Sequence, residues 1–324
     1  MVLALGLPAA PLASAQSPAP GAQPPAPSSG SPAAQAQPSP TSGIYVVKKQ
    51  VEEVQLHATV LDKNHRLVTN LDKSAFTVFE DGKPQQITSF RREDIPVSIG
   101  ILVDNSGSMR EKRAAVNNAA LNLVRSSNPE DEVFVVNFSE EAYIDQSFTS
   151  DIKLLREALE KIESRGGTAM FDAIVGAADE LKRNGKREKK VLLVITDGED
   201  NASKQTLEQA IRHVQDQNGP TVYTIGIFGQ DEGRGEKKRA ERALKAISSR
   251  TGGAAFLPKS LAEVDSVSQE VARDIRSQYS LGYKTPVTRP GYRTVKVTAK
   301  ARGYSNLEVR TRSGYFAGEG ASPK

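Results

Sequence analysis

Cysteine is absent from the sequence of 324 residues. The chain therefore forms no disulfide, binds no zinc through thiolates, holds no iron–sulfur cluster and offers no thiolate nucleophile. Aromatic residues are scarce, at 6%, while hydrophobic residues make up 38%, which suits one or two ordinary globular cores. The formal net charge is only +4. Because neither a basic stripe nor an aromatic platform is visible, nucleic-acid binding is not expected.

Charged residues are also missing from the first 47 positions, and Lys48 is the first of them. This region begins with the apolar stretch MVLALGL and reaches Ala13-Ser14-Ala15, a small-x-small pattern of the kind that signal peptidase cleaves. We therefore expect a signal peptide at residues 1–15, without the usual positive n-region, and an exported protein that is periplasmic or extracellular. The Pro/Ala/Ser-rich residues 16–43 favour a disordered linker. We expect no transmembrane helix, because proline interrupts the apolar runs.

Apolar runs alternate with helical patterns after Pro96. The runs suit strands that are buried on both faces, and they cover residues 97–103, 133–138, 191–195 and 222–228. The helical patterns cover residues 110–126, 151–164, 171–184, 206–217, 236–250 and 261–277. This alternation predicts an α/β fold with a doubly wound, mostly parallel sheet over residues 96–278.

The flanking segments have the period-two pattern of half-buried strands. Apolar and polar residues alternate from Val54 to Val60, and alternation returns after Gln278. Each flank supplies about three strands, too few for a core of its own. We therefore expect residues 44–95 and 279–316 to form one smaller β-sandwich-like domain. The α/β domain would be inserted into it, and residues 317–324 would form a C-terminal tail.

Short oxygen-bearing side chains follow the first buried run, at Asp104, Ser106 and Ser108. In a loop at the carboxyl end of a parallel strand, alternate residues point the same way, into the crevice where such folds bind ligands. Thr168 follows two glycines before a helical pattern, and Asp197 follows another buried run. All five side chains can therefore meet at one edge of the sheet. Carboxylates together with neutral hydroxyls describe a site for a small hard cation.

Simpler interpretations exist for single residues of these loops. Asp104 alone could cap a helix, although a cap does not require three distant loops. For Asp200 we favour a solvated or capping role. The pair Gly166-Gly167 lacks the Gly-Lys-Ser/Thr context of a nucleotide-binding loop. The charged stretch from residue 231 to 242 either borders the metal site or, more commonly for such a run, begins a solvated helix.

The five residues resemble the metal-ion-dependent adhesion site of von Willebrand factor type A domains. The matching features are Asp-x-Ser-x-Ser at positions 104–108, Thr168 after two glycines, and Asp197 in Thr-Asp-Gly. The resemblance covers roughly residues 95–278, and the flanks resemble bacterial secreted proteins related to this family. It implies that Ser106, Ser108 and Thr168 bind the ion through hydroxyl oxygens, while Asp104 and Asp197 act directly or through water. The implied ion is Mg²⁺, with Mn²⁺ or Ca²⁺ as alternatives.

The resemblance also implies a function, namely a protein-binding module that captures an Asp or Glu carboxylate of a partner protein through the ion. Such capture needs no reaction, so we do not expect an enzyme. An alternative is a structural or assembly component of the cell envelope in which the metal only stabilises the fold. A magnesium-dependent phosphohydrolase is less favoured, because a nucleophilic Asp104 would need a second carboxylate where Ser106 stands.

Overall fold

The computed structural model describes residues 53–92, 94–126, 128–160, 164–229, 233–286 and 289–318. All of them belong to one compact unit, Gln50–Lys324. The described α-helices are α1 (Arg113–Arg125), α2 (Ile152–Glu160), α3 (Met170–Asn184), α4 (Leu207–Val214), α5 (Arg234–Thr251) and α6 (Val264–Arg276). Short 3₁₀ turns lie at Lys73–Ala75, Gly107–Met109 and Leu261–Glu263.

A six-stranded sheet forms the centre of the α/β part, in the order β10-β9-β8-β5-β6-β7. Its strands are β5 (Val97–Asp104), β6 (Glu132–Phe138), β7 (Ala142–Thr149), β8 (Lys189–Thr196), β9 (Thr221–Gly226) and β10 (Ala255–Phe256). All neighbours are parallel except β6 and β7, which are antiparallel. The parallel strands therefore end at one common edge, and that edge carries the candidate site.

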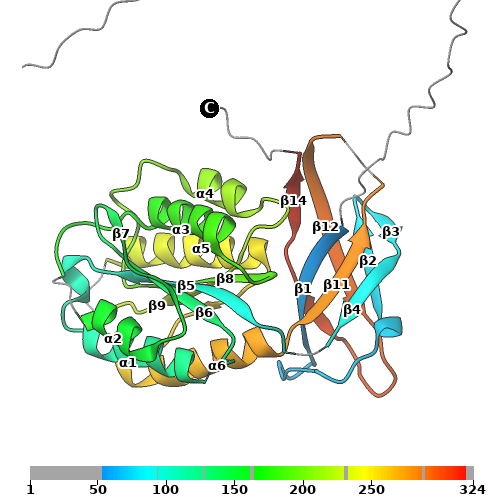
Figure 1. The fold of residues 1–324 in the computed structure, drawn as a ribbon, viewed down its shortest axis with the longest axis horizontal. Coiled ribbons are helices and arrows are strands. Elements are labelled where there is room, and N and C mark those ends of the chain that lie inside the picture. Colours follow the sequence, from blue (N-terminus) through cyan, green and yellow to red (C-terminus); the bar gives the residue numbers. More distant parts are fainter. Residues whose placement is uncertain are drawn as a thin grey trace, which may run out of the picture. The chain divides into compact units, whose positions relative to one another are not determined.

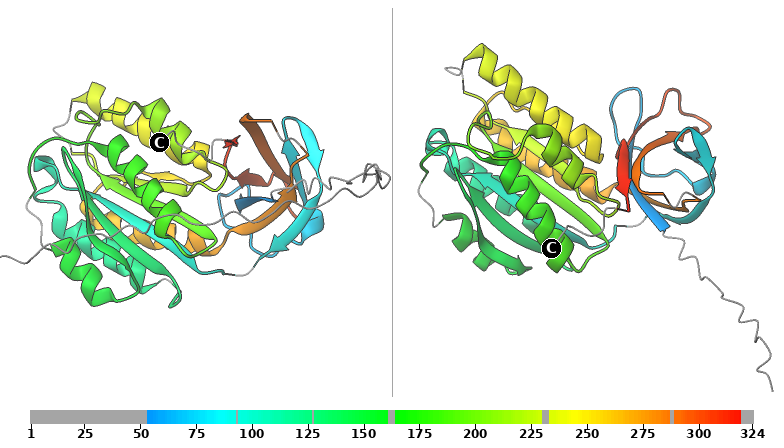
Figure 2. Two further views of the ribbon diagram at one scale, coloured as in Figure 1. Left: turned by 45° about the horizontal axis from the view of Figure 1, so that its top comes forward. Right: turned by 90° about the horizontal axis from the view of Figure 1, so that it is seen from above.

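Helices cover both faces of this sheet (Figure 1). Side chains of α1, α2 and α6 pack with Ile99, Ile101 and Val103 on one face. Side chains of α3, α4 and α5 pack with Leu102 and Leu192 on the other. Figure 2 shows the same two helix layers from other directions. Because β5 is buried on both faces, it is apolar at nearly every position rather than at alternate ones.

Two four-stranded antiparallel sheets make up the rest of the described fold, in the orders β13-β1-β11-β4 and β14-β12-β2-β3. Each sheet combines strands that precede the α/β part with strands that follow it, and their inward side chains share one hydrophobic core. The early strands are β1 (Glu53–Leu61), β2 (Phe76–Glu80), β3 (Lys83–Gln85) and β4 (Ile87–Arg91). The late strands are β11 (Tyr279–Lys284), β12 (Gly291–Ala299), β13 (Glu308–Arg310) and β14 (Gly314–Ala317).

A buried carboxylate links the early and late strands inside this core. Glu80, at the end of β2, is 1% exposed. Its Oε2 accepts hydrogen bonds from the hydroxyls of Tyr283 (2.6 Å) and Tyr315 (2.8 Å). Its Oε1 accepts one from Thr285 Oγ1 at 2.6 Å. A buried carboxylate is tolerated only where such donors replace water, so these bonds fix the pairing of the two flanks.

The predicted fold class is confirmed, namely an α/β fold with a mostly parallel sheet accompanied by antiparallel sheets built from the flanks. Several details differ from the prediction. The edge strands β7 and β10 were not predicted, the described part of each flank has four strands rather than about three, and α1 begins at Arg113 rather than at residue 110 because the 3₁₀ turn comes first. The predicted signal peptide and linker lie outside the described residues. None of the helices in the described ranges combines the length and hydrophobicity that crossing a membrane requires.

Candidate metal centre

Asp104 is the last residue of β5 and is fully buried. Its Oδ1 accepts a hydrogen bond from the backbone N–H of Ser106 at 2.8 Å, which closes the turn after the strand. Its Oδ2 accepts one from Thr196 Oγ1, at the end of the neighbouring strand β8, at 2.5 Å. Burial raises the pKa of the Asp104 carboxyl above its ordinary value, and the charge of Asp197 adds to this, while the bonds from Thr196 and Ser106 oppose it.

Three further predicted oxygens lie next to one another. Ser106 Oγ and Ser108 Oγ are 3.1 Å apart, and Ser108 Oγ donates to Oδ1 of Asp197 at 2.9 Å. Asp197 directly follows β8 and its side chain is 0% exposed. The tertiary structure therefore joins residues 89 positions apart in the sequence.

Thr168 reaches the same place from the loop before α3. Its backbone N–H donates to Oδ1 of Asn201 at 2.9 Å, and its carbonyl accepts from the N–H groups of Asn201 (3.0 Å) and Ala202 (3.1 Å). Thr168, Ser108 and Asp197 line a common cavity of about 300 Å³. Asp104 and Ser106 do not line this cavity, but they are hydrogen-bonded to residues of the same edge. The fold thus gathers all five predicted residues at the carboxyl edge of the sheet.

The donor set has the chemistry and spacing that a small hard cation requires. Oxygens that are neighbours around Mg²⁺, each about 2.1 Å from it in octahedral geometry, are about 3 Å apart. The separations between Ser106, Ser108 and Asp197 have this size. Within the described ranges no group of three or more His, Cys, Asp or Glu side chains is placed to hold a metal. All five residues thus have the oxygen chemistry for a divalent ion held by carboxylates and neutral hydroxyls, and Ser106, Ser108 and Asp197 also have the spacing.

Three residues of this site were not predicted. Thr196 holds Asp104, Asn201 holds Thr168, and Lys112 donates from Nζ to Oδ2 of Asp197 at 2.5 Å. Thr196 directly precedes Asp197, so its place next to a predicted ligand could have identified it from the sequence. Lys112 and Asn201 carry no such signal, because only the fold brings them to their partners.

Asp200 and the start of α5 have more than one interpretation on sequence alone, and the fold decides between them. Oδ2 of Asp200 accepts from the backbone N–H of Phe171 at 2.8 Å, in the first turn of α3. This confirms a capping role for Asp200.

Glu236 and Lys237, in the first turn of α5, line the cavity beside Asp197. Glu236 is exposed and Lys237 half-buried, so this stretch is a solvated helix start that also borders the candidate site.

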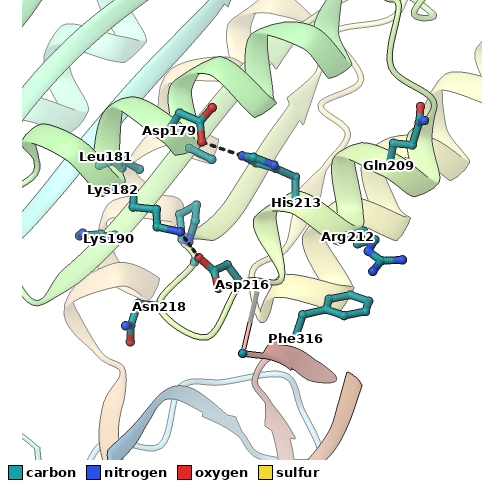
Figure 3. A pocket seen from close by; sticks show the side chains of 14 residues that line it. Asp179, Leu181, Lys182, Lys190, Gln209, Arg212, His213, Asp216, Asn218 and Phe316 are labelled. Carbon is teal, nitrogen blue, oxygen red and sulfur yellow. Dashed lines mark hydrogen bonds and ion pairs between the residues drawn. The ribbon is translucent and has the colours of Figure 1, made fainter. Parts of the chain in front are cut away.

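A second cavity, of about 540 Å³, contains none of the five predicted residues (Figure 3). Both of its acidic side chains are engaged by neighbouring side chains. Asp179 pairs with Nε2 of His213 at 2.8 Å, and Asp216 pairs with Nζ of Lys182 at 2.6 Å. Arg212 lies over the ring of Phe316, with 4.6 Å between the guanidinium carbon and the ring centre. These groups satisfy one another, so the cavity offers no comparable set of converging ligand atoms.

Comparison with known proteins finds solved structures that are similar to this chain. None of the curated proteins matches it. The vWF domain of the type V pili tip protein Mfa5 from Porphyromonas gingivalis is 13% identical, covering 56% of this chain and 95% of that one, with a TM-score of 0.47. A von Willebrand factor type A protein from Catenulispora acidiphila is 16% identical, with coverages of 84% and 76% and a TM-score of 0.46. Proximal thread matrix protein 1 from the mussel byssus, with a zinc-occupied MIDAS motif, is 17% identical, with coverages of 61% and 50% and a TM-score of 0.48.

A family model matches the segment that carries the site. Residues 99–199 match the von Willebrand factor type A domain. The matched segment contains all five predicted metal ligands and the ends of both strands, β5 and β8, that lead to them. The part of the chain that holds the candidate metal centre is therefore similar to a von Willebrand factor type A domain.

Proposed function

We propose that this protein is a metal-dependent, adhesion-type protein-binding module. Asp104, Ser106, Ser108, Thr168 and Asp197 would hold a divalent cation, Mg²⁺ in the first place, which takes an Asp or Glu side chain of a partner protein. The observation that carries the proposal is the close spacing of Ser106, Ser108 and Asp197 at 3.1 and 2.9 Å. The match of residues 99–199 to a family of binding domains supports it.

Each residue has a distinct part in this proposal. Ser106, Ser108 and Thr168 provide neutral hydroxyl oxygens, and the carboxylates of Asp104 and Asp197 provide the negative charge. When bound, the ion supplies a hard positive position for a carboxylate oxygen of the partner. The cavity lined by Ser108, Thr168 and Asp197 gives the partner's side chain a path to that position.

We propose no catalytic reaction for this site. A phosphate-transferring aspartate is paired with a second carboxylate that moves the proton. The residue two positions after Asp104 is Ser106, whose hydroxyl lies against Ser108. We further propose that the protein is exported, on the basis of the apolar N-terminal stretch and its Ala-Ser-Ala sequence.

Metal binding by the full chain is the direct test. Mg²⁺ and Mn²⁺ would be titrated by calorimetry into the wild type, Asp104→Asn and Asp197→Asn, with Asp72→Asn as the control. Asp72 is an exposed aspartate in a single 3.4 Å ion pair with Arg92, so the control makes the same chemical change away from the site. We expect saturable binding in the wild type and control and its loss in both site variants. Equal binding by all four proteins would contradict the proposed site.

Partner capture then separates binding from a structural role of the metal. Candidate partners would be cross-linked to the wild type and to Asp104→Asn in Mg²⁺ or in chelator. An adhesion-type module loses its partner in chelator and in the variant. A structural component keeps its partner in both cases while its thermal stability falls. Asp104-dependent phosphatase turnover would favour an enzyme instead.

A further inference from the structure

We propose that Lys112 and Arg113 neutralise the two carboxylates of the metal centre, so that a bound divalent ion keeps an excess of positive charge and selects an anionic ligand. This inference rests on the proposed function and concerns the specificity of the same site. The two residues are adjacent in the sequence, yet each lies close to a different aspartate. No feature of the Asp-x-Ser-x-Ser motif requires cations at these positions.

Lys112 contacts one carboxylate oxygen of Asp197, and the other oxygen stays available to the proposed metal ion. Its Nζ donates to Oδ2 of Asp197 at 2.5 Å and to the carbonyl oxygen of Ile227 at 3.2 Å. Ser108 donates to the other oxygen, Oδ1. The side chain of Lys112 is only 17% exposed and that of Asp197 is 0% exposed, so water screens this pair weakly. The carbonyl of Ile227 fixes the ammonium independently of the carboxylate.

Arg113 lies beside Asp104. It is 8% exposed, and its Nη1 is 3.5 Å from the backbone oxygen of Asp104 and 3.1 Å from Oδ1 of Asn137. Its Nη2 donates to the carbonyl oxygen of Leu159 at 2.9 Å. The guanidinium is thus held by neutral acceptors, and its charge acts on the carboxylates of Asp104, first, and of Asp145.

The formal charges of Lys112 and Arg113 cancel those of Asp104 and Asp197. The cavity wall adds Glu199, which is paired with Arg239 at 2.6 Å, and the neighbouring charges Glu236 and Lys237. A divalent ion bound by the two aspartates alone would form a neutral unit. With Lys112 and Arg113 the same unit is positive. Such a site should hold the bare ion less tightly and attract a carboxylate more strongly, because nearby like charges repel and opposite charges attract in a poorly screened site.

The test measures metal affinity and carboxylate affinity separately in the full chain. The variants are Lys112→Met, which removes the charge but keeps an apolar chain, and Lys112→Gln, which also keeps a hydrogen-bond donor. Arg110→Met is the matched control, since Arg110 is an exposed cation of the same turn whose guanidinium donates to the carbonyl oxygen of Ser164, at 3.3 Å, rather than to a carboxylate. Mn²⁺ binding would be followed by electron paramagnetic resonance. Acetate is the carboxylate probe. Its binding would be followed through the ¹³C relaxation rate of acetate, which protein-bound Mn²⁺ increases.

The proposal predicts opposite changes in the two affinities. Both Lys112 variants should bind Mn²⁺ about three- to tenfold more tightly, and their Mn²⁺-loaded forms should bind acetate at least about threefold more weakly. The control should change both by less than about twofold. If Lys112 only orients Asp197, Lys112→Met will weaken Mn²⁺ binding and Lys112→Gln will restore it. That result, or no change in either variant, would overturn the proposal. If Lys112→Met does not fold, Lys112→Gln decides the outcome alone.

Failure of this inference is distinguishable from failure of the proposed function. If the wild type binds no Mn²⁺, or binds it equally well after Asp104→Asn, the metal site itself is wrong. If Asp104→Asn abolishes binding while the Lys112 variants behave as the wild type, the site stands and only the charge argument fails.

Discussion

Thr196 Oγ1 donates a hydrogen bond to Oδ2 of Asp104 over 2.5 Å, joining the ends of β8 and β5 beneath the candidate metal centre. The bond fixes one carboxylate oxygen while the backbone of Ser106 fixes the other. Outer hydrogen bonds of this kind orient metal-binding side chains. Asp104 is therefore positioned before any ion arrives.

Replacing Thr196 by valine should weaken metal binding without unfolding the protein. Valine has nearly the shape of threonine but cannot donate to Asp104, so the carboxylate loses its orientation. We expect Mn²⁺ affinity to fall about tenfold. Calorimetric titration checks this, with Thr224→Val as control, because Thr224 is a buried threonine of β9 whose hydroxyl lies 3.2 Å from Ser248 Oγ, away from the site. Equal losses in both variants would mean that the effect is not specific to the Asp104 contact.

Lys189 should make stability rise with pH in the alkaline range. It is 3% exposed, its Nζ donates to the carbonyl oxygen of Ile275, and burial, aided by the charge of Arg276, lowers its pKa from 10.5 to about 7. The folded protein therefore releases this proton near pH 7, whereas the unfolded chain keeps it until about pH 10.5. Between these values the unfolded state binds more protons, so the free energy of unfolding increases with pH, by at most about 1.4 kcal/mol per pH unit.

Urea unfolding between about pH 7 and about pH 9.5 measures this slope. Lys189→Met should lose the contribution, and its stability curve should be flatter than that of the wild type by up to about 1 kcal/mol per pH unit. Lys83→Met, at an exposed position of β3, is the control and should keep the wild-type slope. A Lys189→Met slope equal to that of the wild type would contradict the assigned pKa.

Arg312 should be required for stability because its guanidinium donates hydrogen bonds to three backbone carbonyls. It is 7% exposed and follows β13, and it donates to the carbonyl oxygens of Asp216 (3.0 Å), Gln217 (2.7 Å) and Gly219 (2.5 Å), in the loop after α4. Arg312→Met leaves these acceptors without their donor and should cost about 2–4 kcal/mol of unfolding free energy.

Chemical denaturation of Arg312→Met beside Arg302→Met tests this expectation. Arg302 is exposed, and its replacement should change stability by less than about 0.5 kcal/mol. A loss of similar size in the two variants would show that the three carbonyls find other donors.

Two glycines of the α/β part should respond oppositely to alanine. Gly252 follows α5 with φ +90°, and an added Cβ would lie 2.6 Å from the backbone nitrogen of Arg312. Gly252→Ala should therefore cost more than about 2 kcal/mol, from the left-handed conformation and the clash together. Gly176, within α3, has open space at its Cβ position, and Gly176→Ala should stabilise the protein by about 0.5–1 kcal/mol. Thermal unfolding compares the two variants, and a neutral Gly252→Ala would contradict the close approach of Arg312 to this helix end.

Local patterns in the sequence determined much of the α/β part. Continuous apolar runs identified β5, β6, β8 and β9 because strands covered on both faces need no polar positions. The strand β7 carried no such pattern, since most of its residues, including Tyr143 and Ile144, are exposed at the sheet edge. It is a strand because it pairs with β6, not because its side chains alternate.

The sequence by itself predicted which oxygen-bearing side chains gather at the candidate site, since the spacing of Asp104, Ser106 and Ser108 and the places of Thr168 and Asp197 after predicted elements suffice to bring them to one edge. Only the tertiary structure decided how these residues are held and what charge surrounds them. Lys112 meets Asp197 across 85 positions, and Thr196 meets Asp104 across 92. Periodicity reports which side chains are buried, but a hydrogen bond between distant segments depends on strand order and register, which no local pattern encodes.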